Sequence, residues 1–289
     1  MPSPSAWTIR GRALSLERPL VMGIVNVTPD SFSDGDRFLS PGAALAHAAR
    51  LIAEGADILD VGGESTRPGA HPVTADEELR RVLPVIRTLA AERPNLAISV
   101  DTVKAAVAEA ALAAGAHIVN DVSGLRLDAE MGAVCAAAEA GVVVMHSRGG
   151  VADMAGTTHA DYAADFLDEM LTELAERVTA AKRAGIEPSA IAVDPGIGFS
   201  KRTEQSLRAL ACLERLAAWG HPVVVGASRK RFIGQITGEE NPSHRAFGSV
   251  GAAVSAYERG AQVLRVHDVA ATRHALDVAA AIRAAGADE

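Results

Sequence analysis

The chain has 289 residues, of which 48% are hydrophobic, 22% charged and only 3% aromatic. This length could hold two average domains, although single α/β barrels of the same size are common. The net charge of −8 argues against a surface for nucleic acid or for an anionic membrane.

The sequence also carries signals about compartment. The N-terminal segment has no apolar signal-peptide core, and no apolar run approaches the length of a membrane span. Cys135 and Cys212 lie in Ala- and Leu-rich contexts outside any Cys-x-x-Cys or Cys/His cluster. This favours free thiols in a reducing compartment over a disulfide or a zinc site. We therefore expect a soluble, cytoplasmic protein without a membrane or nucleic-acid partner.

In chain order, short apolar segments alternate with helical ones. Residues 1–18 are expected to form a lead-in, with a hairpin around Arg10, Gly11 and Arg12, before a domain over residues 19–286. Strands are expected at Leu20–Val25, Asp57–Val61, Leu96–Val100, His117–Val119, Val142–Met145, Ala190–Val193, Pro222–Val225 and Gln262–Val266. Helices are expected at Pro41–Glu54, Asp76–Glu92, Val103–Ala114, Asp128–Ala140, Asp161–Ala184 and Thr203–Ala218, with one or two between Phe232 and Arg259 and a last one after Asp268.

These elements form eight strand-then-helix units. The strands are rich in Val and Ile and mostly lack polar alternation, which is typical of strands buried on both faces. Eight such units predict an α/β fold, a single-domain (β/α)8 TIM barrel. A doubly wound open sheet is the alternative. No composition shift or linker indicates a second domain.

Polar side chains follow nearly every strand. The strand ends carry Asn26, Gly62 to Arg67, Asp101, Asn120, His146, Asp194, Ser228 to Lys230, Arg265 and His267. On a barrel the carboxyl ends of all strands face one mouth, where ligands bind. The sequence therefore predicts a ligand site at this mouth.

One group of these residues suits a flat heterocycle. It combines two carboxylates, an amide and an ammonium: Asp101, Asn120, Asp194 and Lys230. Carboxylates accept from amino and ring N–H groups, and Lys donates to acceptors. Met145 and Phe199 could pack on the two faces of such a ring. Capping of the following helices is an alternative role for the two Asp residues.

A second group suits an anion. Arg265 and His267 follow the eighth strand, where barrels often hold phosphate. Asn26 offers an amide oxygen, which can bind Mg²⁺ when the ion also binds phosphate oxygens. The chain has no P-loop, no G-x-S-x-G elbow and no His-x-x-x-His pattern.

Several motifs match a known family. They are MGIVNVTPDSFSDG (22–35), DVGGESTRPGA (60–70), SVDT (99–102), IVNDVSG (118–124), DPGIGF (194–199), GASRKRFIG (226–234) and RVHDV (265–269). Through them the chain resembles the dihydropteroate synthases over roughly residues 19–278. The resemblance implies a (β/α)8 barrel that joins 4-aminobenzoate to a pterin diphosphate, releasing pyrophosphate and forming 7,8-dihydropteroate for folate synthesis. It also implies Mg²⁺ and a homodimer.

The resemblance assigns roles residue by residue. Asn26 corresponds to the Mg²⁺ ligand beside the diphosphate, and Asp34 to a helper of Mg²⁺ or of the developing charge. Asp101, Asn120, Asp194 and Lys230 correspond to the pterin contacts, and Arg265 and His267 to the diphosphate contacts. Phe32, Thr66, Arg67, Pro68, Ser228 and Arg229 correspond to the aminobenzoate side. Asp34, Lys230, Arg265 and His267 are the expected catalytic residues.

Two other functions are weighed against the synthase. A methyltransferase that hands a methyl group from a folate to a corrinoid would share the pterin residues, but it would not need the S-T-R-P-G loop or the anion groups. A paralogue that binds pterin without catalysis should have lost a loop or anion residue, and none is lost. Ser147 stands where the family usually has an apolar residue, which alters pocket shape at most.

Overall fold

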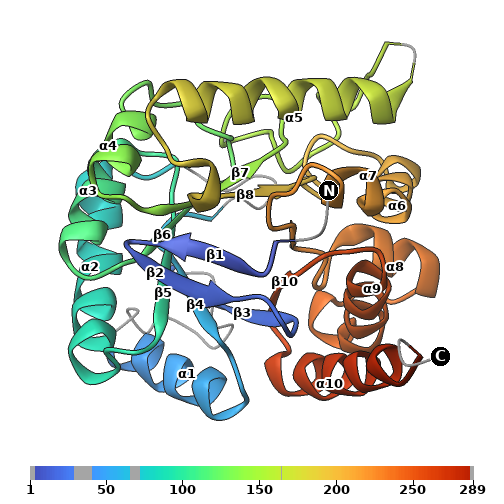
Figure 1. The fold of residues 1–289 in the computed structure, drawn as a ribbon, viewed down its shortest axis with the longest axis horizontal. Helices are drawn as coiled ribbons and strands as arrows, with labels where there is room; N and C mark the ends of the chain where they lie inside the picture. Colours follow the sequence, from blue (N-terminus) through green and yellow to red (C-terminus); the bar gives the residue numbers. More distant parts are fainter. Residues whose placement is uncertain (1–3, 29–40, 66–71, 164, 287–289) are drawn as a thin grey trace.

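The structure is a computed structural model that describes residues 4–28, 41–65, 72–163 and 165–286 (Figure 1). Its centre is a sheet of eight parallel strands: β3 (Leu20–Asn26), β4 (Ile58–Gly62), β5 (Ala97–Asp101), β6 (Ile118–Asp121), β7 (Gly141–Met145), β8 (Ile191–Asp194), β9 (Val224–Val225) and β10 (Val263–Val266). They are ordered β8-β7-β6-β5-β4-β3-β10-β9.

The two edges of this sheet meet. Val193 of β8 forms a parallel bridge with Val223, just before β9, and the Val193 N–H donates to the Pro222 carbonyl at 2.8 Å. The sheet therefore closes into a barrel. The predicted (β/α)8 barrel is confirmed, and the alternative of an open doubly wound sheet is wrong.

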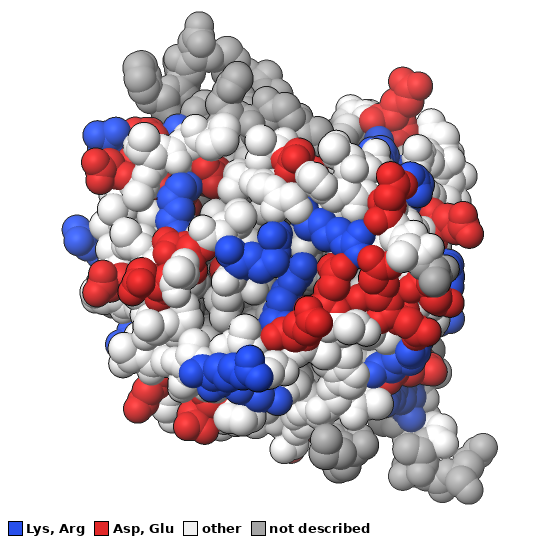
Figure 2. Space-filling view, turned by 90° about the horizontal axis from the view of Figure 1, so that it is seen from above, with Lys and Arg blue, Asp and Glu red and all other residues white. Residues whose placement is uncertain are grey.

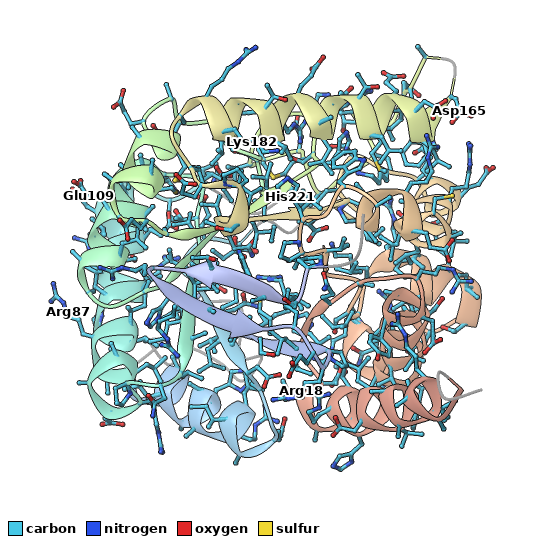
Figure 3. The ribbon with its side chains drawn as sticks, in the orientation of Figure 1. Arg18, Arg87, Glu109, Asp165, Lys182 and His221 are labelled. Carbon is cyan, nitrogen blue, oxygen red and sulfur yellow. The ribbon has the colours of Figure 1, made fainter. Side chains whose placement is uncertain are left out.

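Helices surround the barrel in a ring (Figure 1). They are α1 (Pro41–Ala53), α2 (Ala75–Glu92), α3 (Ala105–Ala113), α4 (Met131–Ala137), α5 (Phe166–Arg183), α6 (Thr203–Ala211), α7 (Leu213–Ala217), α8 (Arg231–Thr237), α9 (Ala246–Glu258) and α10 (Val269–Gly286), with 3-10 turns at Pro188–Ala190 and Pro242–His244. Arg87 on α2 and Glu109 on α3 point away from the barrel, as Figure 3 shows. No helix in the described part of the chain is long and apolar enough to cross a membrane.

The expected N-terminal hairpin forms. β1 (Ala6–Ile9) pairs antiparallel with β2 (Arg12–Ser15), and the two turn residues between them, Arg10 and Gly11, both have positive φ (47° and 70°). Such a turn matches the twist of the two strands. The hairpin lies across one end of the barrel (Figure 1).

This end is the amino-terminal end of the strands, and it is apolar. Trp7 and Ile9 are fully buried there among inward-facing residues such as Ile58 and Val263. The indole N–H of Trp7 donates to the Ala190 carbonyl at 2.8 Å. The hairpin therefore closes the amino-terminal end of the barrel, and the polar interior positions lie toward the carboxyl-terminal end.

Candidate active site

The site is built on side chains that point into the barrel near the carboxyl ends of the strands. Strand register sets their height, since Asp101 pairs with Asn120 and Met145 pairs with Asp194 across neighbouring strands. Paired residues in a parallel sheet project to the same face. The sequence-predicted pterin residues of these four strands therefore face the barrel interior.

Arg265 is the centre of the first half of the site. Its Nε donates to Asp60 Oδ2 and its Nη2 to Asp101 Oδ2, both at 2.6 Å. Asn120 Nδ2 also donates to Asp60 Oδ2, at 3.0 Å. The structure thus brings Asp101, Asn120 and Arg265 together, as predicted from their strand ends.

Asp60 is the residue that the sequence interpretation missed. It lies inside β4 rather than after it, and it is fully buried. Its Oδ1 has no hydrogen-bond partner among the described residues. An Asp within the apolar run ILDVG was the available signal, because an ionisable residue is rarely fully buried unless it is paired.

Asp194, Phe199 and Lys230 form the second half. Gly196 N donates to Asp194 Oδ1 at 2.7 Å, so the segment after β8 folds back on its own carboxylate. Lys230 Nζ lies 4.2 Å from the centre of the Phe199 ring and donates to the Ile197 carbonyl. The predicted ring-facing Phe199 and the predicted donor Lys230 are therefore neighbours.

Burial and mutual charge shift the ionisation of these groups. Desolvation raises the pKa of Asp101, against the pull of Arg265, and raises the pKa of Asp194, against the hydrogen bond from Gly196. Desolvation lowers the pKa of Lys230 to about 7, although Asp194 opposes this. Clusters of such shifts in a cleft are typical of functional sites.

In Arg265 the charged form is favoured, in contrast to Lys230. Burial disfavours its charge, but the carboxylates of Asp60 and Asp101 outweigh that effect and hold its pKa above the ordinary value. The side chain still exposes 21% of its surface, and that of Asp101 exposes 16%. The guanidinium is thus fixed in place and remains accessible from the mouth.

The predicted anion residues lie on the adjoining strand ends. Ser228 Oγ lies 3.0 Å from His267 Nδ1 and accepts from His267 N at 3.2 Å. Arg229 Nε donates to Asp268 Oδ2 at 3.0 Å, and Arg229 N donates to Ser249 Oγ at 2.8 Å. Ser228 and His267 are therefore together. Arg229 is tied to Asp268, a partner that the sequence interpretation did not name.

Asn26 ends β3 and is partly exposed at the same mouth. Its side chain has no hydrogen-bond partner among the described residues. No group of three His, Cys, Asp or Glu side chains in that part of the chain could hold a metal. Five predicted site residues lie outside the described residues: Phe32, Asp34, Thr66, Arg67 and Pro68. Their assignments stay predictions.

Known proteins are similar to this chain in sequence and in fold. Residues 22–267 match the family described as pterin binding enzyme. A dihydropteroate synthase of Synechocystis is 43% identical over 266 residues, covering 92% of this chain and 91% of the relative.

Solved structures agree with the sequence match. A Xanthomonas albilineans dihydropteroate synthase with 4-aminobenzoic acid superposes with a TM-score of 0.89 at 48% identity, covering 98% of this chain and 99% of the other. The same organism's enzyme in complex with 7,8-dihydropteroate has a TM-score of 0.84 at 45% identity, covering 97% and 99%. The chain therefore belongs to the pterin binding enzyme family and, within it, to the dihydropteroate synthases.

Proposed function

We propose that the mouth of this barrel joins 4-aminobenzoate to the methylene carbon of (7,8-dihydropterin-6-yl)methyl diphosphate, giving 7,8-dihydropteroate and pyrophosphate. The observation that carries the proposal is the cluster in which Arg265 bridges Asp60 and Asp101 beside Asn120. In this cluster the Arg265 guanidinium, a cation suited to a departing diphosphate, lies next to carboxylates that can accept hydrogen bonds from a heterocycle. The relatives with 4-aminobenzoic acid and with 7,8-dihydropteroate support one substrate and the product of this reaction.

The pterin slot follows from donors and acceptors. Asp101 and Asp194 accept from the amino and ring N–H groups of the pterin, and Lys230 donates to its carbonyl or ring nitrogen. Phe199, already beside Lys230 Nζ, packs on one face of the ring. Met145, level with Asp194 in the neighbouring strand, packs on the other.

The first step of the proposed reaction is departure of the diphosphate. The bond between the methylene carbon and the diphosphate oxygen breaks, and its electron pair leaves with the diphosphate. Arg265 and His267 stabilise that developing charge. A guanidinium has five N–H donors, and Arg265 uses two of them on Asp60 and Asp101. The remaining donors serve the diphosphate oxygens.

The electron-rich pterin stabilises the positive charge left on the methylene carbon, so no protein nucleophile is required. The aminobenzoate nitrogen then forms the new C–N bond with its lone pair and loses one proton. We assign the aminobenzoate side to Phe32, Thr66, Arg67, Pro68, Ser228 and Arg229, and we assign Asp34 to the loop beside the diphosphate.

A magnesium ion fits this donor set. Among the described residues no group of three acidic or His side chains could hold it, so Asn26 would supply an amide oxygen and the substrate the remaining non-water ligands. Sharing ligands with phosphate oxygens and water is the usual habit of Mg²⁺. When bound, the ion would neutralise charge on the diphosphate.

The activity is tested in two ways. The gene should restore growth without added folate end products to a strain that lacks its own dihydropteroate synthase. The purified protein should release pyrophosphate only when both substrates are present. Failure of both tests, with pterin still bound in a titration, would instead support a pterin-binding paralogue.

We also propose a cytoplasmic homodimer. Cys135 and Cys212 are both free, which suits a reducing compartment. Phe247 on α9 is 93% exposed and Ile236 on α8 is 59% exposed. An apolar cavity of about 260 Å³ between α6, α8 and α9, lined by Ile236 among others, adjoins them. An exposed aromatic side chain beside an apolar groove suits a two-fold contact between identical patches.

Sedimentation tests the dimer. We expect a dimer at micromolar concentration, and a shift toward monomer for Phe247→Ser but not for Leu127→Ser, which changes an exposed residue near α4. A monomeric parent protein would refute the proposal.

A further inference from the structure

Lys201 carries a buried amino group that the proposed reaction does not use. It follows the Asp194–Ser200 segment and is fully buried. Its Nζ lies 2.8 Å from His146 Nδ1 and donates to the Phe199 carbonyl at 3.1 Å and to the His146 carbonyl at 3.4 Å. The Lys201 amino group therefore ties the backbone of the pterin-facing Phe199 to the end of β7.

The other ring nitrogen of His146 faces a carboxylate on α5. His146 Nε2 lies 3.0 Å from Glu173 Oε2. Burial is the main cause that lowers the pKa of His146 to about 3. The Glu173 carboxyl is partly desolvated, but its contacts with His146 and Arg148 prevail and lower its pKa to about 2. Since a neutral imidazole must donate to the carboxylate, its Nδ1 is left to accept from Lys201.

Glu173 stands at the wall of a surface groove. The cavity, of about 480 Å³, is lined by Arg126, Ser147, Arg148, Glu173 and Arg177 among others. Figure 2 looks down on α5, where basic and acidic side chains lie next to one another. Glu173 also accepts from Arg148 Nε at 3.0 Å. Arg148, which lines the same groove, therefore holds the Glu173 carboxylate in place.

The segment before Lys201 is conformationally constrained at both ends. Gly196 has φ +67°, and a Cβ placed on it would lie 1.9 Å from the His146 carbonyl oxygen. At the other end Ser200 has φ +49°, a region that costs free energy for a residue with a side chain. The two ends are constrained by backbone contacts, while Phe199 between them must hold its ring at the pterin face.

We infer that Lys201, oriented by His146 and Glu173, is a positioning residue that sets the height of Phe199 and thereby the affinity of the site for the pterin substrate. The inference rests on the proposed function. It extends the pterin site through three residues that do not touch the ligand, from Phe199 to the outer face of α5.

Lys201→Met tests the inference because it keeps an unbranched side chain that is one atom shorter and removes every side-chain N–H donor. We expect the KM for the pterin diphosphate to rise about tenfold, with kcat reduced less than about threefold and the KM for 4-aminobenzoate unchanged. Arg273→Met is the control. Arg273 is a buried cation that donates to the Pro19 carbonyl at 2.8 Å, at the opposite end of the barrel. This variant should lower the melting temperature without moving either KM.

A second pair of variants decides the matter if Lys201→Met does not fold. Glu173→Ala removes the acceptor that fixes the His146 tautomer, and should raise the pterin KM about threefold. Glu173→Gln retains an acceptor oxygen and should behave like the parent. An unchanged pterin KM in Glu173→Ala, or equal rises in both Glu173 variants, would overturn the inference. A parent protein without synthase activity would overturn the proposed function instead, which separates the two failures.

Discussion

At the scale of single residues, the site depends on charges that hold one another in place. Arg265 is fixed by two carboxylates, whereas burial lowers the pKa of Lys230 to about 7 against the attraction of Asp194. Arg265 is therefore charged at every working pH, and Lys230 is the group whose donor strength changes with pH. Each property leads to a different measurement.

Lys230 should give the pH profile its alkaline limb. A lysine with a lowered pKa is protonated below that pKa and neutral above it, so kcat/KM for the pterin substrate should fall as pH rises through about 7. In Lys230→Arg the cation cannot lose its proton, so the fall should vanish while the plateau drops by about tenfold. Titration of the substrate is common to both enzymes. Superimposable profiles would contradict this role of Lys230.

Asp60 should matter as much as the residues that the sequence singled out. Asp60→Asn leaves Arg265 with only the Asp101 carboxylate, and we expect kcat/KM to fall by about ten- to a hundredfold. Ser99 is the matched control, because it pairs with Asp60 across β4 and β5 and its buried hydroxyl has no partner among the described residues. Ser99→Ala should be nearly neutral in activity and melting temperature. Equal effects of the two changes would show that Asp60 only fills space.

At the scale of elements, strand order and strand ends were predictable, and helix bounds were less so. Apolar runs followed by polar residues marked all eight strands, since a strand buried on both faces leaves a clear signal. The expected helix Asp161–Ala184 instead begins at Phe166, because the Asp165 side chain accepts from Leu167 N at 2.8 Å. Asp60 was missed because its role depends on Arg265, which is 205 positions away.

The segment after β8 should tolerate no Cβ at its first turn. Gly196→Ala would place a methyl carbon 1.9 Å from the His146 carbonyl oxygen in a backbone with φ +67°. We expect a loss of about 2–4 kcal/mol of stability together with a large loss of pterin binding. In Gly251→Ala, within α9 and with nothing near the added atom, stability should rise slightly because Ala favours the helix. Thermal melts and pterin titrations would compare the two, and a normal pterin affinity in Gly196→Ala would contradict the prediction.

At the scale of the whole molecule, the barrel separates stability from chemistry along its axis. The amino-terminal end is closed by the hairpin and its apolar contacts, and the carboxyl-terminal end holds the charged site. At the closed end Arg18, labelled in Figure 3, pairs with Asp57. The sequence predicted the hairpin from its turn residues, but not that it closes the barrel, because nothing local indicates where Trp7 packs.

Trp7→Ala should therefore reduce stability and spare catalysis. The change removes a fully buried indole and its hydrogen bond to the Ala190 carbonyl, at a cost of about 3–5 kcal/mol. For a chain of this size that corresponds to a drop in melting temperature of roughly 6–20 °C. At a temperature where both proteins are folded, kcat and both KM values should match those of the parent, because the site lies at the other end of the barrel. Ala13→Ser, on an exposed position of the same hairpin, should leave the melting temperature unchanged. A Trp7→Ala protein that melts normally would show that Trp7 does not stabilise the barrel, and one that is folded but inactive would show that the two ends are not independent.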